Sequence, residues 1–314
     1  MYFKLVILLA ACVSGSIRMD AQQSAMSLLE SIRSGDTMLV KKILAGHPDL
    51  NVTDSDGDGV LKYAALYSHP AMMTILVDAG ADVNQLNGMK ETALMWSMPD
   101  TLKAALLLSR GAAVNSISSE GNSALLIACV GSNQSAIIRL LLGVGADAGA
   151  VNAKGATALI RLAGYGDTTS ANLLVNAGCN LHEKMRDSLN ALFPAVKSGN
   201  LPMVKWLLDK GIDANAPDLY KVTPISYVTT SDNLELVKLL LDRTVDINRP
   251  DIDGFTPLMW AVYNEHDNPD IVQAFIDRGA DPKFVASNGE SVLDWARKKG
   301  ETKTVSLLKK YTPR

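Results

Sequence analysis

One leucine position recurs along most of the chain at a nearly constant interval. The first example is Leu28, the last is Leu293, and the successive steps are 33, 33, 31, 34, 33, 33, 33 and 35 residues. The full series is Leu28, Leu61, Leu94, Leu125, Leu159, Leu192, Ile225, Leu258 and Leu293. A glycine follows in phase at Gly80, Gly111, Gly145, Gly178, Gly211 and Gly279, with Thr244 as the exception. This period indicates nine small repeated units rather than one or two ordinary globular domains.

Each unit combines two short apolar helices with a polar turn. One helix pair has too little apolar surface to fold alone, so neighbouring units must stack and form a core that runs along the array. Glycine after the second helix supplies a left-handed cap, and Pro224 and Pro257 stand in a first helical turn. A hydrophobic content of 47% with only 5% aromatic residues fits short helices rich in alanine and leucine.

The unit from Thr223 to Thr256 resembles the ankyrin repeat. The sequence Gly80-Ala81-Asp82-Val83-Asn84 closely matches the hairpin signature of that family. The resemblance extends over residues 24–314. It implies an all-α solenoid of about nine helix-turn-helix units with β-hairpin tips. The terminal caps are expected at about 24–58 and 291–314.

The chain departs from the family at the histidine of the Thr-Pro-Leu-His motif. That position holds Met95, Leu126, Ile160, Phe193, Ser226, Met259 and Asp294 in successive units. Without the hydroxyl-to-imidazole link, we expect a less stable array than consensus repeats form. Arg161 occupies a place that holds Trp96, Tyr227, Trp260 and Trp295 elsewhere. It either extends its head to the concave surface or pairs there.

Residues 1–23 differ from the array. Lys4 precedes an uncharged apolar run, 5–11, that is too short to span a bilayer and is typical of an export signal. Leu9-Ala10-Ala11-Cys12 resembles the bacterial lipobox, which implies acylation of Cys12 and a tether up to residue 23. The residue after the cysteine is Val13 and not the aspartate that resembles a signal for retention in the inner membrane. We therefore expect a periplasmic protein that is anchored to the outer membrane. Cleavage after Gly15 or Ala21, or retention of the segment, remains an alternative.

The sequence contains no recognisable catalytic or cofactor-binding constellation. His47, His69, His182 and His266 are dispersed over different units without the spacing of a helical zinc site. The segment 54–59 matches the opening of a calcium-binding EF-hand loop, but the twelfth position, which needs a glutamate, holds Ala65. We therefore predict a non-enzymatic protein without cofactor or metal. A net charge of −3 disfavours nucleic acid as a partner.

Two cysteines remain after Cys12. Cys129 falls in a first helix, whereas Cys179 follows the glycine that ends a second helix one unit later. These positions favour two buried thiols over a disulfide bridge.

Recognition of another protein is the function that remains. The family resemblance implies a concave binding surface made of hairpin tips and first helices, and we expect its centre in the fifth to eighth units. Large apolar side chains at the tips would serve as anchors. The candidate residues are Arg161, Glu183, Lys184, Arg186, Leu219, Tyr220, Ile252, Asp253 and Phe255. The alternative is that Val222 and Phe255 pack one tip against the next.

Three roles are compatible with an exported binding protein. One resembles the envelope immunity proteins that neutralise toxins such as phospholipase effectors. Another resembles periplasmic ankyrin proteins that support an antioxidant or other resident enzyme. A third is a secreted ankyrin effector, for which Cys12 would be dispensable. In each role the partner is a protein, and any contact with the membrane is made only through a lipid anchor at Cys12.

Overall fold

The computed structural model describes residues 26–230, 233–264, 268–300 and 302–312. The predicted signal segment and tether, 1–23, lie outside these residues. The chain divides into two compact units. The first ends at Ala128 and also takes Arg139–Asp147, and the second consists of Cys129–Ile138 and the chain from Ala148 onward.

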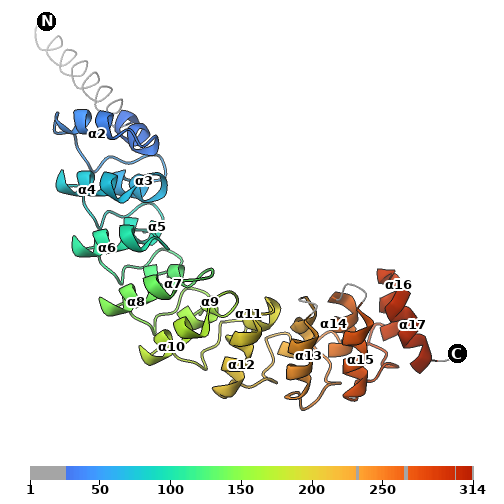
Figure 1. Cartoon of the computed structure of the whole chain (residues 1–314). Coiled ribbons are helices and arrows are strands. Elements are labelled where there is room, and N and C mark those ends of the chain that lie inside the picture. Colours follow the sequence, from blue (N-terminus) through green and yellow to red (C-terminus); the bar gives the residue numbers. More distant parts are fainter. Residues whose placement is uncertain (1–25, 231–232, 265–267, 301, 313–314) are drawn as a thin grey trace, which may run out of the picture. The chain divides into compact units, whose positions relative to one another are not determined.

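Nine helix pairs follow one another along the described residues (Figure 1), which confirms the predicted all-α class. The first four pairs are 26–33 with α2 (Thr37–Leu44), α3 (Val60–Tyr67) with α4 (Pro70–Asp78), α5 (Ala93–Trp96) with α6 (Thr101–Ser109), and α7 (Ala124–Ala128) with α8 (Ser135–Gly143). The next five are α9 (Ala158–Leu162) with α10 (Thr168–Asn176), α11 (Leu192–Lys197) with α12 (Leu201–Asp209), η1 (Pro224–Thr230) with α13 (Leu234–Leu241), α14 (Pro257–Asn264) with α15 (Pro269–Asp277), and α16 (Val292–Lys299) with α17 (Thr302–Tyr311).

Side-chain caps define where many of these helices begin. The Asp100 carboxylate accepts hydrogen bonds from the backbone N–H groups of Leu102 and Lys103, and Asn200 and Asn233 cap α12 and α13 in the same way. At the start of α16, Ser291 and Asp294 form a reciprocal capping box. Asp294 stands where the family has its histidine, so this departure supplies a helix cap instead.

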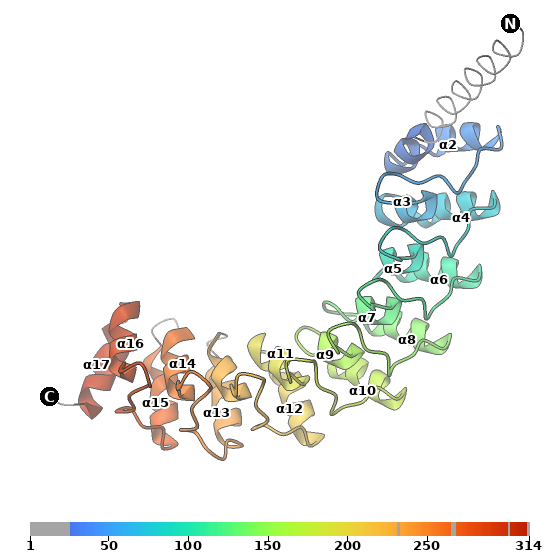
Figure 2. The same cartoon turned by 180° about the vertical axis from the view of Figure 1, so that it is seen from behind.

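Within each unit of the chain, first helices pack on first helices and second helices on second helices (Figure 2). In the first unit α3, α5 and α7 are in contact, and α4 packs on α6; in the second, α11, η1, α14 and α16 form a continuous row. The recurring alanines of the first helices, Ala64, Ala128, Ala195, Ala261 and Ala296, are all buried. Their small side chains allow the close approach of neighbouring helices.

One first helix is not an α-helix. Residues 224–230 form a 3₁₀ helix, η1. The sequence Pro-Ile-Ser-Tyr-Val-Thr-Thr is rich in β-branched residues, which lose side-chain freedom in an α-helix. In the third repeat α5 has only four residues and is followed by a cis Met98–Pro99 bond.

The predicted hairpins are reduced to tight turns. In each of eight turns, the N–H of the first residue donates to the carbonyl of the fifth, as between Asp54 and Asp58 (3.1 Å) or Asp251 and Phe255 (3.0 Å). We call these five-residue turns the tips; they begin at Asp54, Asn87, Ser118, Asn152, Met185, Asp218, Asp251 and Ala286. Over the described residues the only β-structure is three isolated antiparallel bridges at such turns. The turns are too short for a longer ladder to form.

An asparagine four residues after the capping glycine or its equivalent ties one repeat to the next. Asn215 donates from Nδ2 to the Arg243 carbonyl (2.9 Å) and accepts from the N–H of Val245 (2.9 Å). Asn84, Asn115 and Asn248 make the same pair of bonds to their own next repeats. In the fifth repeat this place holds His182.

Restoring this pair of bonds should stabilise the array. An asparagine at position 182 would stand in register to reach the Gly211 carbonyl and the Asp213 N–H. We therefore expect His182→Asn to raise the free energy of unfolding by about 1 kcal/mol, and Asn215→Ala to lower it by about 1 kcal/mol, a typical net value for such bonds. Urea denaturation followed by circular dichroism measures both. An unchanged midpoint for Asn215→Ala would show that the bonds contribute nothing.

Candidate binding surface

In five of the repeats an aromatic residue stands where the first helix meets its tip. These residues stand two residues after the repeated leucine or isoleucine and nine after the first tip residue: Tyr63, Trp96, Tyr227, Trp260 and Trp295. Tyr63 donates from its hydroxyl to Asp54 (2.8 Å), and Tyr227 donates to Asp218 (3.0 Å). Trp260 donates from Nε1 to Asp251 (2.7 Å). These bonds fix each aromatic ring against its tip.

The first residue of the tip organises the turn itself. Asp54 Oδ1 accepts from the backbone N–H groups of Asp56 and Asp58, both at 2.9 Å. Desolvation, the largest single effect, would raise the pKa of Asp54, but the bonds from Asp58, Tyr63 and Asp56 together lower it below its ordinary value. The carboxylate in the segment resembling an EF-hand is therefore engaged by protein donors.

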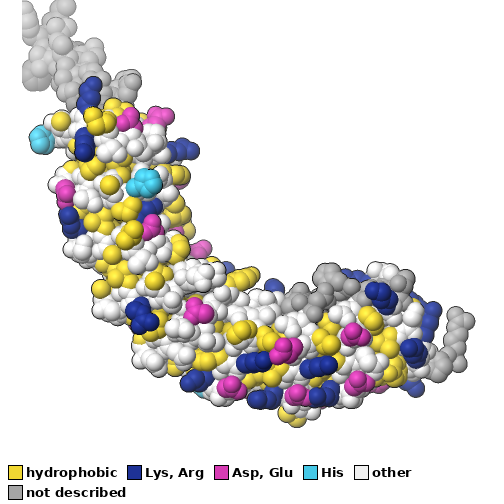
Figure 3. All heavy atoms as spheres, in the orientation of Figure 1, with side chains coloured by type: hydrophobic (Ala, Val, Ile, Leu, Met, Phe, Trp, Pro, Cys, Tyr) yellow, Lys and Arg dark blue, Asp and Glu magenta, His cyan; other side chains and the backbone are white. Residues whose placement is uncertain are grey.

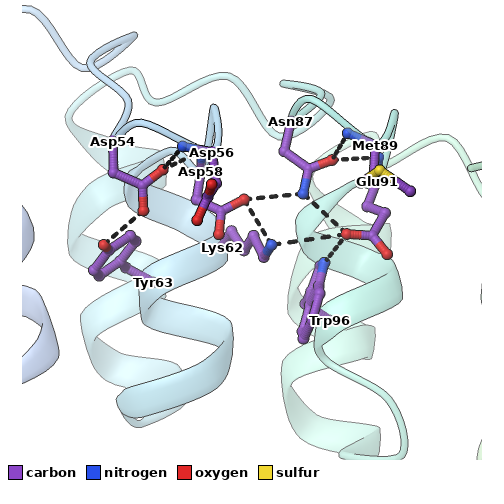
Figure 4. A network of polar contacts seen from close by, with 9 residues as sticks. All are labelled: Asp54, Asp56, Asp58, Lys62, Tyr63, Asn87, Met89, Glu91 and Trp96. Atoms are coloured by element: carbon purple, nitrogen blue, oxygen red, sulfur yellow. Dashed lines mark hydrogen bonds and ion pairs between the residues drawn. The ribbon is translucent and has the colours of Figure 1, made fainter.

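A polar network joins the second and third repeats (Figure 4). Lys62 Nζ lies 2.6 Å from Asp58 Oδ1 and 3.7 Å from Glu91 Oε2, and it sits 4.0 Å from the centre of the Trp96 ring. Asn87 Nδ2 bridges both carboxylates, at 2.9 Å to each. The Lys62 side chain is only 11% exposed. A lysine from within the chain thus fills a niche between two carboxylates and an indole ring.

The second compact unit of the chain carries a cluster of aromatic rings, which also lies where the first helices of its repeats meet their tips. The Phe255 ring lies 4.6 Å from that of Trp295 and 6.1 Å from that of Trp260. Tyr263 contacts both tryptophan rings, and Lys299 Nζ lies 4.8 Å from the Tyr263 ring centre. The cluster ties together the eighth and ninth repeats and holds the Trp260 ring in place.

A pocket of about 360 Å³ opens beside this cluster, among the sixth to eighth repeats. Its walls are Lys197, Tyr220, Val222, Ser226, Tyr227, Asp251, Asp253 and Trp260. Tyr220 is 59% exposed at the rim, whereas Ser226 and Asp251 are buried at its wall. The pocket therefore combines three aromatic side chains with two carboxylates.

Two of the predicted binding residues, Tyr220 and Asp253, line this pocket. Leu219 and Ile252 lie beside it as exposed tip residues, and their backbone N–H groups donate to the carbonyls of Asp187 and Tyr220 in the preceding tips, at 2.9 Å each. The expectation that Phe255 is an exposed tip residue was wrong. It is half-buried because its ring packs on Trp295 of α16, the first helix of the next repeat.

The other candidates lie on the fifth repeat and its tip. Lys184 and Arg186 are exposed, whereas Glu183 is half-buried and accepts a bond from Asn180 (2.8 Å). Arg161 is half-buried on α9. None of these four lines the pocket with Tyr220. The sequence interpretation did not single out the Lys62 network, although the aromatic residue nine positions after each tip aspartate was a readable signal.

The outer surface of the second unit has a different character. Figure 3 shows basic and acidic side chains interspersed along it. Lys205 pairs with Glu235 (2.7 Å), and Arg278 pairs with Asp242, each joining the second helices of neighbouring repeats or the segments after them. Exposed pairs of this kind contribute at most about 1 kcal/mol each and mark a solvated surface.

A model of ankyrin repeats (three copies) matches residues 28–118, 97–185, 125–218 and 192–285, which together cover most of the chain. The chain belongs to the ankyrin-repeat family. Ankyrin repeats are protein-binding modules and generally have no catalytic activity of their own.

Several curated proteins share part of this ankyrin array. The target of rapamycin complex 2 subunit AVO2 of Saccharomyces cerevisiae is 29% identical over 54% of this chain and 41% of its own length. The B-cell lymphoma 3 protein homolog of Mus musculus is 29% identical over 57% of this chain and 42% of its own. An L-asparaginase of Dirofilaria immitis is 26% identical over 62% of this chain and 28% of its own. The chain spans less than half the length of each of these three relatives.

In the part of the chain that the structure describes, both cysteines are buried free thiols. Burial raises the pKa of both free thiols, Cys129 and Cys179, and so disfavours the reactive thiolate. Among the described residues, no three side chains of histidine, cysteine, aspartate or glutamate are grouped to hold a metal ion. No helix in those same ranges has the length and apolarity to cross a bilayer.

The Lys62 network can be tested by removing its cation. Lys62→Met leaves Asp58 and Glu91 as neighbouring, mostly buried carboxylates, and we expect a loss of about 2 kcal/mol in the free energy of unfolding. Adding Glu91→Gln should recover part of that loss, since it removes the charge repulsion. Urea unfolding of the single and double variants measures the coupling. Strictly additive effects would contradict the network.

Tyr227, whose hydroxyl donates to the tip residue Asp218, should lose its proton only well above the ordinary pKa of a tyrosine. The pKa of Tyr227 is raised to about 12, first by burial and then by the charge and the hydrogen bond of Asp218. The stability that this tyrosine contributes is therefore complete below pH 10, its ordinary pKa, and is lost as the pH rises through about 12. Difference absorbance titration against Tyr227→Phe isolates this phenol.

Asp218→Asn is the matched variant for that titration. Asn152 accepts from the N–H groups of Lys154 and Ala156 at 3.0 Å each, which shows that asparagine can organise a tip. The turn should survive, and the pKa of Tyr227 should fall toward 10. The same late titration in both proteins would show that Asp218 has no influence on the phenol.

Proposed function

We propose that this ankyrin protein binds another protein through the tips of its sixth to eighth repeats and the adjoining ends of their first helices. The observation that carries the proposal is the pocket of about 360 Å³, with exposed Leu219, Tyr220 and Ile252 around it. Large side chains beside a partly buried pocket are typical of the centre of a protein interface. Tip-to-tip backbone bonds hold these groups in a fixed arrangement before any partner arrives, which lowers the cost of ordering on binding.

A second, more specific proposal concerns the location of the protein in the cell and the kind of partner that it binds. We propose that it is exported and anchored through Cys12 to the outer membrane, and that in the periplasm it neutralises a toxin acting in the cell envelope. The sequence of residues 4–12 supports export, and the exposed recognition surface supports tight capture of one partner. A membrane-tethered inhibitor would meet a lipid-degrading toxin where that toxin acts.

Membrane fractionation tests the anchor. The full-length protein should appear in the membrane fraction and carry acyl chains by mass spectrometry, whereas Cys12→Ser should lose both properties, because acyl chains supply the apolar surface that holds the protein to the bilayer. Val13→Ala is the matched control, which leaves the cysteine in place. An acyl-free wild-type protein would overturn the anchoring proposal but not the binding surface.

The partner is tested separately, by mass spectrometry of proteins that co-purify from envelope extracts, including extracts of cells that express neighbouring genes. A stoichiometric hydrolase or other toxin is expected, and the purified ankyrin protein should inhibit its activity. Double substitution of Leu219 and Tyr220 by serine should weaken the complex by about a hundredfold, as expected when anchors at the centre of an interface are truncated. Recovery of only a resident oxidoreductase would replace the immunity role by that of a scaffold.

A further inference from the structure

The pocket beside Tyr220 and the Lys62 network occupy the same register of the array, 164 residues apart. Tyr63 and Tyr227 stand in equivalent places, as do Trp96 and Trp260. Each tyrosine donates its hydroxyl to the aspartate nine residues earlier. The two sites are therefore built on one framework within the same molecule.

In the network of Figure 4, Lys62 supplies the cation at the centre of this framework. Its ammonium group contacts Asp58 and Glu91 and lies 4.0 Å from the centre of the Trp96 ring. An ammonium group over an indole face is attracted by the ring's electron density, and partial burial strengthens that attraction. The framework thus accommodates a primary ammonium with the protein's own side chain.

In the second site the residue in the place of Lys62 is Ser226, which is buried and too short to reach the aromatic ring. Neither of the two acids that hold Lys62 recurs in the second site. Val222 stands in the place of Asp58, and Phe255 stands in the place of Glu91. The result is an open pocket of about 360 Å³ where the first site has a filled niche.

The pocket nevertheless keeps acidic groups, at other positions of the same tips. Asp251 replaces Asn87, and Asp253 replaces Met89. Asp251 is fixed by bonds from Asp253 N–H, Phe255 N–H and Trp260 Nε1, while the Asp253 side chain is exposed. Lys197 also lines the pocket and has interactions of its own. Two carboxylates against one lysine leave the lining with a net negative charge.

We propose that this pocket receives a lysine or arginine side chain of the protein partner, with its cationic head in the place that Lys62 fills in the earlier repeats. The inference rests on the proposed binding function and adds the chemistry of the partner's anchor. A volume near 360 Å³ lies at the small end of ligand pockets, about 300 to 1,000 Å³, and suits one side chain. Trp260 is already held by Phe255, Trp295 and Tyr263, so its ring needs no reordering on binding.

A small cation tests the pocket without knowledge of the partner. The probe is butylguanidinium, with butylurea as its neutral analogue of similar shape, and the readout is the indole N–H resonance of Trp260 in the full-length protein. We expect a saturable shift with butylguanidinium and about tenfold weaker binding of butylurea, because only the cation gains from the carboxylates and the ring face. Equal binding of both probes, or no saturable shift with either, would overturn the proposal.

Substitutions at Ser226 provide the matched pair. Ser226→Lys should close the pocket with an internal ammonium, as Lys62 does, and reduce butylguanidinium binding by at least about tenfold. Ser226→Ala leaves the pocket open and should bind as the wild type does. Asp253→Asn changes only an exposed side chain and should weaken butylguanidinium binding by about threefold, the value of one partly screened charge. Unaltered cation binding in both Ser226→Lys and Asp253→Asn contradicts the proposal.

The partner recovered by co-purification separates this inference from the proposed function. If the partner binds wild-type protein and Ser226→Lys equally well, the protein-binding function stands and the cation pocket is wrong. If butylguanidinium binds with the expected selectivity but no protein partner is recovered, the cation pocket stands and the proposed function fails. Loss of partner binding in Ser226→Lys, with retention in Ser226→Ala, supports both.

Discussion

The fold depends on the burial of each repeat's apolar face by its neighbour. A pair of short helices such as α5 and α6, with four and nine residues, cannot form a core alone. Stacking places every inner repeat between two others, so a given core position is packed against the same helices each time it recurs. This requirement fixes the spacing of the leucines and of the buried alanines. It leaves the tips and the exposed helix ends free to vary, since these do not close the core.

The tips are fixed by polar bonds rather than by burial. Aspartate or asparagine at the first tip position turns the backbone, and the aromatic residue nine positions later ties that turn to a helix. Backbone bonds between successive tips, such as that from Leu219 to Asp187, then align the surface. Large side chains can therefore stand at the tips without being needed for folding. A binding surface on such a framework can change its chemistry one side chain at a time.

The spacing of landmarks was sufficient to predict the all-α class and the nine helix pairs, because stacking enforces that spacing. It did not predict that residues 224–230 form a 3₁₀ helix, since the local conformational preferences of Ile225 and Val228 act independently of the repeat. At the candidate surface, two of the predicted binding residues, Tyr220 and Asp253, line a pocket. The position of Phe255 was mistaken because tip spacing does not show that Trp295, 40 residues later, lies against it. The Lys62 network was missed for the same reason: Glu91 is 29 residues away in sequence.

Comparison of the two equivalent sites shows how one framework is filled by the chain's own side chain in one place and left open in another. Where Lys62 fills the niche, the carboxylates and the indole ring are engaged within the chain and stabilise the contact between two repeats. Where Ser226 stands instead, the framework keeps its aromatic walls, Tyr227 and Trp260. The serine side chain is too short to fill the space between them, which stays open as a pocket. The framework survives this loss because Tyr227 and Trp260 are each fixed by an aspartate of their own tip. A position that contributes stability in one repeat can therefore become a recognition site in another, with no change in the fold.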